Sequence, residues 1–258
     1  SYGKNIDGSL TYTIRKLSYS YSEKGQLEVI ENVAIGEGRV KLNGIEVSYI
    51  GEDNETVSVE VDNFGNYYVS KTENHYLNPQ EWKGKVLVDW SLTRTDATNL
   101  DGSKSQTVSY FHYNYNPENG LLNEDNPVDN IDPGTGIVFP LGAEVLVAGN
   151  VYSHKVDTRR NPNINTLTVG GDIFGNSYCT ELENIYGNIF GQVKLILSNS
   201  LTETLNADGS EAKTKSSLIY EYTNGQERNL SRTQIDERDI NLILGKKGLL
   251  KAITQRKV

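Results

Sequence analysis

A long internal repeat constrains this chain more than any other sequence feature. Residues 62–76 return 110 residues later as residues 172–186, with the same Asp, Phe-Gly-Asn, Tyr, Glu-Asn and Tyr at matching places. After a three-residue deletion the match continues, so that Asp-Gly-Ser at 101–103 aligns with Asp-Gly-Ser at 208–210. Each copy of a repeat has to bury the same faces in the same way. The repeat therefore predicts a duplicated structural unit and says little about chemistry.

Alternation of apolar and polar residues predicts that the unit is built from strands. Within 85–95 the apolar residues recur at every second position, which is the period of a half-buried strand. A second alternating run at 105–115 follows an Asp-Gly pair, the dipeptide typical of hairpin turns. The other copy repeats this arrangement in 191–204 and 213–222. Each copy is thus expected to contain a long antiparallel hairpin.

The segments 63–66 and 173–176 predict tight turns between two further strands of each copy. The shared glycine is expected to take a positive φ, and the shared phenylalanine to anchor the turn on the core. A third, fainter copy is predicted at the start of the chain, in an alignment that places Gly8 opposite Gly191, with chance similarity among β hairpins as the alternative.

Together these patterns predict an all-β protein of two related antiparallel domains, each sandwich-like or a partly open barrel. The expected boundaries are 1–122 for the first domain, 123–136 for an acidic linker rich in Pro and Gly, and 137–258 for the second domain. At most one short helix is expected, near the C-terminus at 234–244.

Charge and hydropathy narrow the classes of partner. The chain carries a net charge of −9, which argues against nucleic acid. Residues 246–258 hold five basic residues and no acid, which indicates a basic tail that is solvated, self-docked, or in contact with anionic lipid or a partner. No apolar stretch reaches the length of a transmembrane helix. The first residues lack a Met and an apolar leader, so we expect a mature exported chain, extracellular or on the cell surface, with earlier trimming or a lipid anchor left open.

The common catalytic motifs are absent from the sequence, so we expect no enzyme. His75 and His112 align with isoleucines of the other copy, and packing or surface roles are favoured for them over metal binding. Cys179 aligns with Val69, which favours a small buried side chain over a nucleophile.

Repeated acids leave a hydrolase open as an alternative. Asp62 matches Asp172 and Glu73 matches Glu183, and paired carboxylates are what glycoside hydrolysis requires. The competing interpretation is that these acids cap turns or lie on a strand edge.

No cofactor is expected, except that the linker supplies oxygen atoms of the kind that Ca²⁺ binds. These are the side chains of Asn123, Glu124, Asp125, Asn126, Asp129, Asn130 and Asp132. No EF-hand spacing is present, and a plain acidic linker is the alternative.

Aromatic side chains are the candidate ligand-binding residues, because rings that carry a polar handle suit a half-wet binding surface. Trp90 alternates in phase with core positions and is expected inside. The residues predicted to bind are Trp82, Tyr113, Tyr115, Tyr220 and Tyr222.

The leading functional prediction is a non-enzymatic extracellular structural or adhesion protein, and one form of it is a filament subunit that assembles by strand addition. Its expected partners are further copies of itself or other surface proteins. A secreted or surface-anchored glycan-binding module is the first alternative, and a β-sandwich hydrolase is the second.

Overall fold

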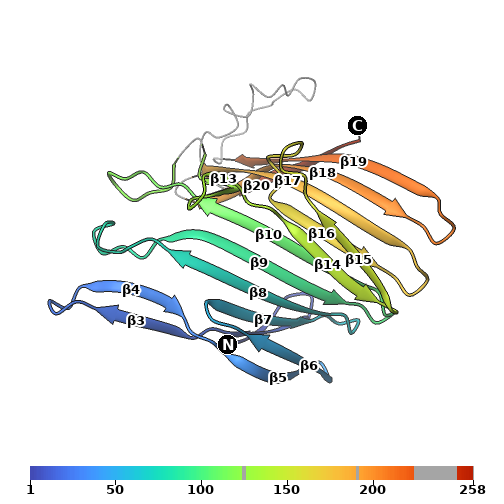
Figure 1. Cartoon of the computed structure of the whole chain (residues 1–258), viewed down its shortest axis with the longest axis horizontal. Helices are drawn as coiled ribbons and strands as arrows, with labels where there is room; N and C mark the ends of the chain where they lie inside the picture. Colours follow the sequence, from blue (N-terminus) through green and yellow to red (C-terminus); the bar gives the residue numbers. More distant parts are fainter. Residues whose placement is uncertain (124–125, 190–191, 224–248, 258) are drawn as a thin grey trace.

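The computed structural model describes residues 1–123, 126–189, 192–223 and 249–257, and within these ranges the protein is all-β, without a helix. Strand pairing is antiparallel throughout this part of the chain (Figure 1). The predicted helix at 234–244 lies outside the described residues. Among the residues described, no helix is long and apolar enough to span a bilayer.

One large sheet dominates the fold. Its order is β1-β2-β7-β8-β9-β10-β16-β17-β18-β19-β20, and β11 pairs beside β10. These strands are β1 (Tyr2–Lys4), β2 (Leu10–Ile14), β7 (Glu55–Val61), β8 (Tyr67–Tyr76), β9 (Val88–Thr98), β10 (Lys104–Tyr113), β11 (Val128–Asp129), β16 (Thr166–Gly171), β17 (Ser177–Ile189), β18 (Gln192–Leu205), β19 (Glu211–Thr223) and β20 (Leu249–Lys257).

Four two-stranded sheets branch from the two long connections of the large sheet. They are β3 (Leu17–Tyr21) with β4 (Leu27–Asn32), β5 (Gly36–Leu42) with β6 (Ile45–Gly51), β12 (Ile131–Asp132) with β13 (Ile137–Val138), and β14 (Gly142–Val147) with β15 (Asn150–Lys155).

The large sheet runs without a break across the predicted linker. Strand β10, before the linker, pairs with β16, after it, over six residue pairs from Lys104↔Gly171 to Ser109↔Thr166. The division of the chain into two domains stays a prediction, but hydrogen bonds of one sheet join the two parts.

Two hairpins cover one face of the large sheet, and the cores lie beneath them. Val40, Leu42 and Val47 of the β5–β6 hairpin pack on Val57 and Val59 of β7. The hairpin β14–β15 lies across β10 and β16 in the same way (Figure 1). Its buried residues Leu141, Ala143, Val145 and Val147 contact Leu92, Val108, Tyr110, Leu167 and Val169. The alternation predicted from the sequence thus places the valines and leucines of the sheet under a local second layer.

The turns at 62–66 and 172–176 have the same hydrogen bonds. In the first, Asp62 Oδ1 accepts from the amides of Phe64 (2.8 Å) and Asn66 (2.9 Å), and Asp62 Oδ2 accepts from Asn66 Nδ2 (2.7 Å). In the second, Asp172 takes the same three bonds at 2.9, 2.9 and 2.6 Å. Gly65 (φ 92°) and Gly175 (φ 96°) have the predicted positive φ.

The expectation that the shared phenylalanine anchors these turns on the core is wrong. Phe64 is 80% exposed and Phe174 is 76% exposed. Each turn is held by the hydrogen bonds of its own aspartate and asparagine, so it does not need a contact between the ring and the core, and the ring projects into solvent.

A second kind of turn occurs three times. Asn-x-Asp-Gly-Ser at 5–9, 99–103 and 206–210 closes the hairpins β1–β2, β9–β10 and β18–β19. In each, the Asn amide donates to the Ser hydroxyl, at 2.8 to 2.9 Å, and the Asp carboxylate accepts from the Ser amide at 2.9 Å. In these turns Gly8 corresponds to Gly102 and Gly209. The predicted third copy aligned Gly8 with Gly191 instead, and Gly191 lies outside the described residues, so that alignment stays a prediction.

Stability should depend on the core beneath the β14–β15 hairpin. Leu167 is fully buried there, so we expect Leu167→Ala to lower the free energy of unfolding by about 2–5 kcal/mol, because it leaves a cavity. Leu100→Ala is the matched control, since Leu100 is 78% exposed, and it should change stability by no more than about 0.5 kcal/mol. Urea denaturation of both variants measures this, and equal losses would contradict the proposed core.

Candidate functional site

The face of the large sheet opposite the two hairpins carries a row of hydroxyl groups. Residues paired in adjacent strands point to the same face, and the register connects nine strands from β2 to β19 in one such row. Every member is serine or threonine: Thr13, Ser58, Ser70, Thr95, Thr107, Thr168, Thr180, Thr202 and Thr214.

A second row lies two residues further along each strand, about 6.7 Å away. It crosses eight strands, and Leu182 is its single residue without a hydroxyl. Its members are Thr56, Thr72, Thr93, Ser109, Thr166, Leu182, Ser200 and Ser216. We call the two rows together the hydroxyl face.

Hydroxyl groups of the face bond to one another in cross-strand pairs. Thr107 and Thr168 are 2.9 Å apart at their Oγ1 atoms, and the pairs Ser70–Thr95, Thr180–Thr202, Thr72–Thr93 and Ser109–Thr166 are similar, at 2.9 to 3.1 Å. In each pair one hydroxyl donates to the other, so the second O–H is left for another acceptor and both oxygens keep lone pairs. Thr166 differs from the rest, because it is buried and also accepts from Asn184 Nδ2 at 3.4 Å. The face therefore offers donors and acceptors at regular intervals.

The two rows are uncharged, although 23% of the chain's residues are charged. The charged residues of the central strands point to the opposite face, because they alternate with the hydroxyls along each strand. They include Lys71, Glu73, Arg94, Glu183, Glu203 and Lys213. Most of the hydroxyl residues are half-buried by their neighbours in the sheet, and Thr214 is exposed.

The predicted aromatic residues gather at the ends of the strands that lie away from the Asn-x-Asp-Gly-Ser turns. Tyr113 and Tyr220 lie on the same face as the hydroxyls, and Tyr186 of β17 lies between them. Burial and the neighbouring Tyr113 and Tyr220 raise the pKa of Tyr186 to about 12. Phe111 stands edge-on to Tyr186, with ring centroids 5.4 Å apart. These four half-buried rings form an aromatic border beside the hydroxyl rows.

The other three predicted residues have structural contacts. The rings of Trp82 and Tyr115 meet edge-on at 5.9 Å. The Tyr115 hydroxyl donates to the carbonyl of Val88 at 3.0 Å, and the Tyr222 hydroxyl donates to that of Leu195 at 2.8 Å. Tyr115 and Tyr222 are equivalent residues of the repeat, so this contact is made twice and braces the strand ends.

A hollow of about 430 Å³ opens beside the first strands of the hydroxyl face. Ser70 and Thr95 of the first row line it, together with Tyr68, Glu60 and the exposed ring of Phe64. Glu60 lies next to the first row and brings a charge to this end of the face.

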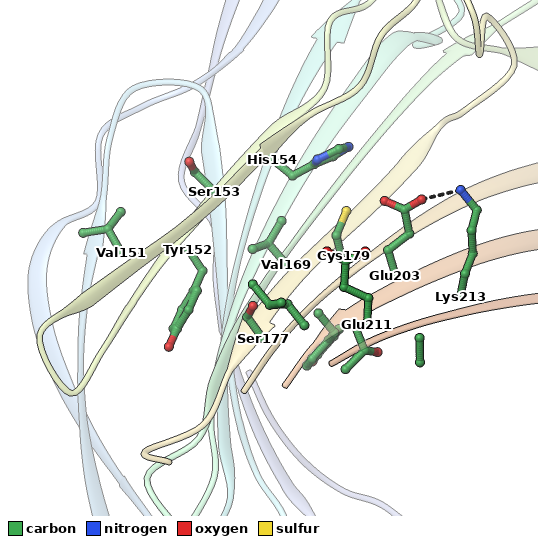
Figure 2. Close-up of a pocket in the computed structure, with 14 residues that line it drawn as sticks. Val151, Tyr152, Ser153, His154, Val169, Ser177, Cys179, Glu203, Glu211 and Lys213 are labelled. Atoms are coloured by element: carbon green, nitrogen blue, oxygen red, sulfur yellow. Dashed lines mark hydrogen bonds and ion pairs between the residues drawn. The ribbon is translucent and has the colours of Figure 1, made fainter. Parts of the chain in front are cut away.

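On the opposite face, a groove of about 750 Å³ lies between the β14–β15 hairpin and strands β16 to β19 (Figure 2). His154 Nε2 is 3.0 Å from Glu181 Oε1, and Glu203 forms an ion pair with Lys213. Cys179 also lines the groove. Burial, with the neighbouring Glu181 and Glu203, raises the pKa of its thiol to about 12, so the thiol stays protonated at neutral pH. It packs against the core beneath the hairpin, in accordance with the small apolar role predicted for it.

A histidine network lies at the strand ends. His112 Nδ1 is 3.0 Å from Asp129 Oδ1, and its Nε2 is 3.6 Å from Asp89 Oδ1. His75 Nδ1 lies 3.1 Å from Asp89 Oδ2, and its ring stacks on Trp90. Hydrogen bonds to the two carboxylates raise the pKa of His112 to about 9. Ion pairing and packing account for these side chains.

In the structure the repeated acids do not come together in one site. Asp62 and Asp172 cap their turns, and Asn199 Nδ2 donates to Glu183 Oε2 at 2.9 Å. In the linker, Asp129 bonds to His112 and Asn114. Among the residues described, no group of three His, Cys, Asp or Glu side chains is placed to share a metal ion. The calcium site stays a prediction, because two of its residues, 124 and 125, lie outside the described ranges.

No family model, curated protein or solved structure matches this chain. The sequence analysis predicted aromatic binding residues, which stay a prediction, and missed the hydroxyl rows. The signal for the rows is present in the sequence: seven strands have Ser or Thr at both of their row positions, as in Thr93-x-Thr95 and Thr166-x-Thr168.

The histidine network predicts a pH-dependent stability. Folding raises the pKa of His112 from 6.5 to about 9, so its contribution is complete below about pH 6.5 and is lost as the pH rises through 9. The pKa values of Asp89 and Asp129 are lowered, so their contribution is lost instead as the pH falls below about 4. From pH 6.5 to 9.5 we expect the free energy of unfolding to fall by roughly 1–3 kcal/mol.

Urea denaturation at both pH values tests this, with NMR titration of His112 beside it. In His112→Gln most of the difference between the two pH values should disappear. A His112 resonance that titrates near pH 6.5 in the folded protein would contradict the network.

Proposed function

We propose that this protein is a non-enzymatic extracellular structural or adhesion protein, and that the hydroxyl face is its working surface. The observation that carries the proposal is the unbroken Ser and Thr row across nine strands, on the side of the sheet away from both hairpins. A face with one chemistry over about 38 Å suits attachment to an extended partner, because every strand contributes the same contact.

The repeated turns support a duplicated unit as the origin of this surface. Strands β7 to β10 correspond to β16 to β19, with the same Asp-capped turn and the same Asn-x-Asp-Gly-Ser turn in each. In both units a hairpin packs on the face away from the hydroxyls, which supports a sandwich-like arrangement. Duplication doubles the length of the hydroxyl rows without any change in register.

If the protein attaches through this face, charge added to the face should weaken its retention on a surface. We expect Thr107→Lys with Thr202→Lys to abolish retention of the protein on solid surfaces, because two ammonium groups interrupt the neutral first row. The control is Leu146→Lys with Val151→Lys on the β14–β15 hairpin, where both residues are exposed. This control should be retained like the unchanged protein.

Retention on cellulose, chitin, silica and collagen-coated plates is the measurement, with circular dichroism to show that each variant is folded. The proposal is wrong if the unchanged protein binds neither these surfaces nor a soluble polymer, or if the two double variants lose retention equally.

Self-assembly by strand addition is the second candidate. Strands β1 and β20 end the sheet order, so each has a sheet partner on one side among the residues described. Ser1 exchanges backbone hydrogen bonds with Thr13, and Asn5 donates to Ser9, so the backbone groups of Tyr2 and Lys4 point away from β2. Such an edge can pair with another chain.

Removal of an outward donor should weaken such pairing. We expect the unchanged protein to form oligomers that grow with concentration, and Lys4→Pro to reduce them, because proline lacks the N–H that faces a new strand. Lys4→Ala keeps that N–H and is the matched control. Light scattering across a range of concentrations measures the oligomers, and a monomer at every concentration excludes assembly by this edge.

A further inference from the structure

We infer that the ligand of the hydroxyl face is a neutral polysaccharide chain that lies along the rows, across the strands, with sugar rings seated against the aromatic border. This inference rests on the proposed function and names the partner of that same surface.

The distribution of charge selects a neutral partner. The chain has a net charge of −9, so an anionic polysaccharide or an anionic lipid surface is repelled as it approaches. The two hydroxyl rows contain no cation to offset that repulsion and no carboxylate to attract a basic protein. A partner without charge is not repelled by the net negative charge of the chain, and it does not need charged groups in the rows for its binding.

The hydrogen-bonding groups match those of a sugar polymer. A hydroxyl pair such as Thr107–Thr168 or Ser70–Thr95 retains one O–H donor beyond the bond within the pair, and several lone pairs. A sugar hydroxyl is also both donor and acceptor, so it can bond to such a pair in either sense. Strands about 4.8 Å apart repeat this group at a fixed interval, which favours a ligand that is itself a polymer.

The aromatic border supplies the second half of a sugar site. A pyranose ring has apolar C–H faces and a polar rim, so it packs on an aromatic ring while its hydroxyls turn to polar neighbours. Phe111, Tyr113, Tyr186 and Tyr220 lie on the hydroxyl side of the sheet. Phe111 is next to the second row, and the three tyrosines lie four residues beyond it along their strands, about 13 Å away. A chain placed between the border and the rows contacts both at once.

The shape of a large sheet favours a single chain over a flat crystal. Adjacent strands of a sheet rotate by about 20–25°, so a row that crosses nine strands follows a curved path. A flexible polymer can follow this path by rotation about its glycosidic bonds, whereas a rigid flat lattice touches only a few strands.

Isosteric removal of hydroxyls tests the inference. Thr107→Val with Thr168→Val deletes both members of one pair, retains their shape, and leaves no unpaired partner behind. We expect this variant to bind soluble neutral polysaccharide about tenfold more weakly, since it loses the pair's contacts to the ligand. Thr107→Ser with Thr168→Ser retains the hydroxyls and should bind within about twofold of the unchanged protein. Tyr220→Ala should weaken binding and Tyr220→Phe should not, because the inference assigns contact to the ring.

The measurement is affinity electrophoresis and calorimetry with laminarin, hydroxyethylcellulose, galactomannan and dextran, at 50 and 500 mM salt. Alginate and anionic vesicles are the charged controls. Retardation by at least one neutral polymer, unchanged by salt and weakened by the valine pair, supports the inference. Retardation by alginate or vesicles alone overturns it, and so does neutral-polymer binding that the valine pair leaves unchanged.

The experiments distinguish an error about the polysaccharide ligand from an error about the hydroxyl face as the working surface. If no neutral polymer binds, but a solid surface retains the protein until the lysine pair Thr107→Lys with Thr202→Lys is introduced, the polysaccharide is wrong and the working face remains. If neither assay depends on the hydroxyl face, both proposals are wrong.

Discussion

The two-residue alternation of side chains along each strand is the constraint on which the structure depends. On one face it gathers Val57, Val59, Leu167 and their neighbours beneath the two hairpins, and on the other it gathers serine and threonine. A register slip of one residue in any strand would move valines to the open side and hydroxyls into the core. The core and the hydroxyl rows both follow from one register kept across the sheet.

The turns maintain that register. Asp62 and Asp172 each accept three hydrogen bonds within five residues, and the Asn-x-Asp-Gly-Ser turns lock the next hairpins of the sheet. Neighbouring turns are also linked, since Asn66 Oδ1 accepts from the amide of Leu100 and Asn176 Oδ1 from that of Ala207. The hairpins of each unit are therefore fixed relative to one another at the same end of the sheet. In this way short polar motifs determine where every residue of the long strands is placed.

The sequence predicted the local features better than the surfaces. The strands, the positive φ of Gly65 and Gly175 and the apolar role of Cys179 follow from local pattern and from comparison of the two copies. The exposure of Phe64 does not, because it depends on how far the core extends. The alternate Ser and Thr residues are visible in the sequence. Their alignment into continuous rows depends on the register between distant strands such as β10 and β16, which the sequence pattern does not give. A connection of more than fifty residues separates those two strands, so local sequence patterns do not predict that they pair.

The chemistry of the open face points to a partner more than to solvation. The exposed face of an antiparallel sheet usually carries Lys and Glu, which keep it soluble and oppose pairing with other sheets. Here the charges of the central strands, among them Lys71, Arg94 and Glu203, lie on the side that also carries the hairpins. Threonine serves a strand as well as valine does, because both are β-branched, so the fold gains local stability from these rows without burying them. A neutral face forgoes the protection that charge gives against non-specific association. Such a face is of most use where its partner is also neutral and rich in hydroxyl groups.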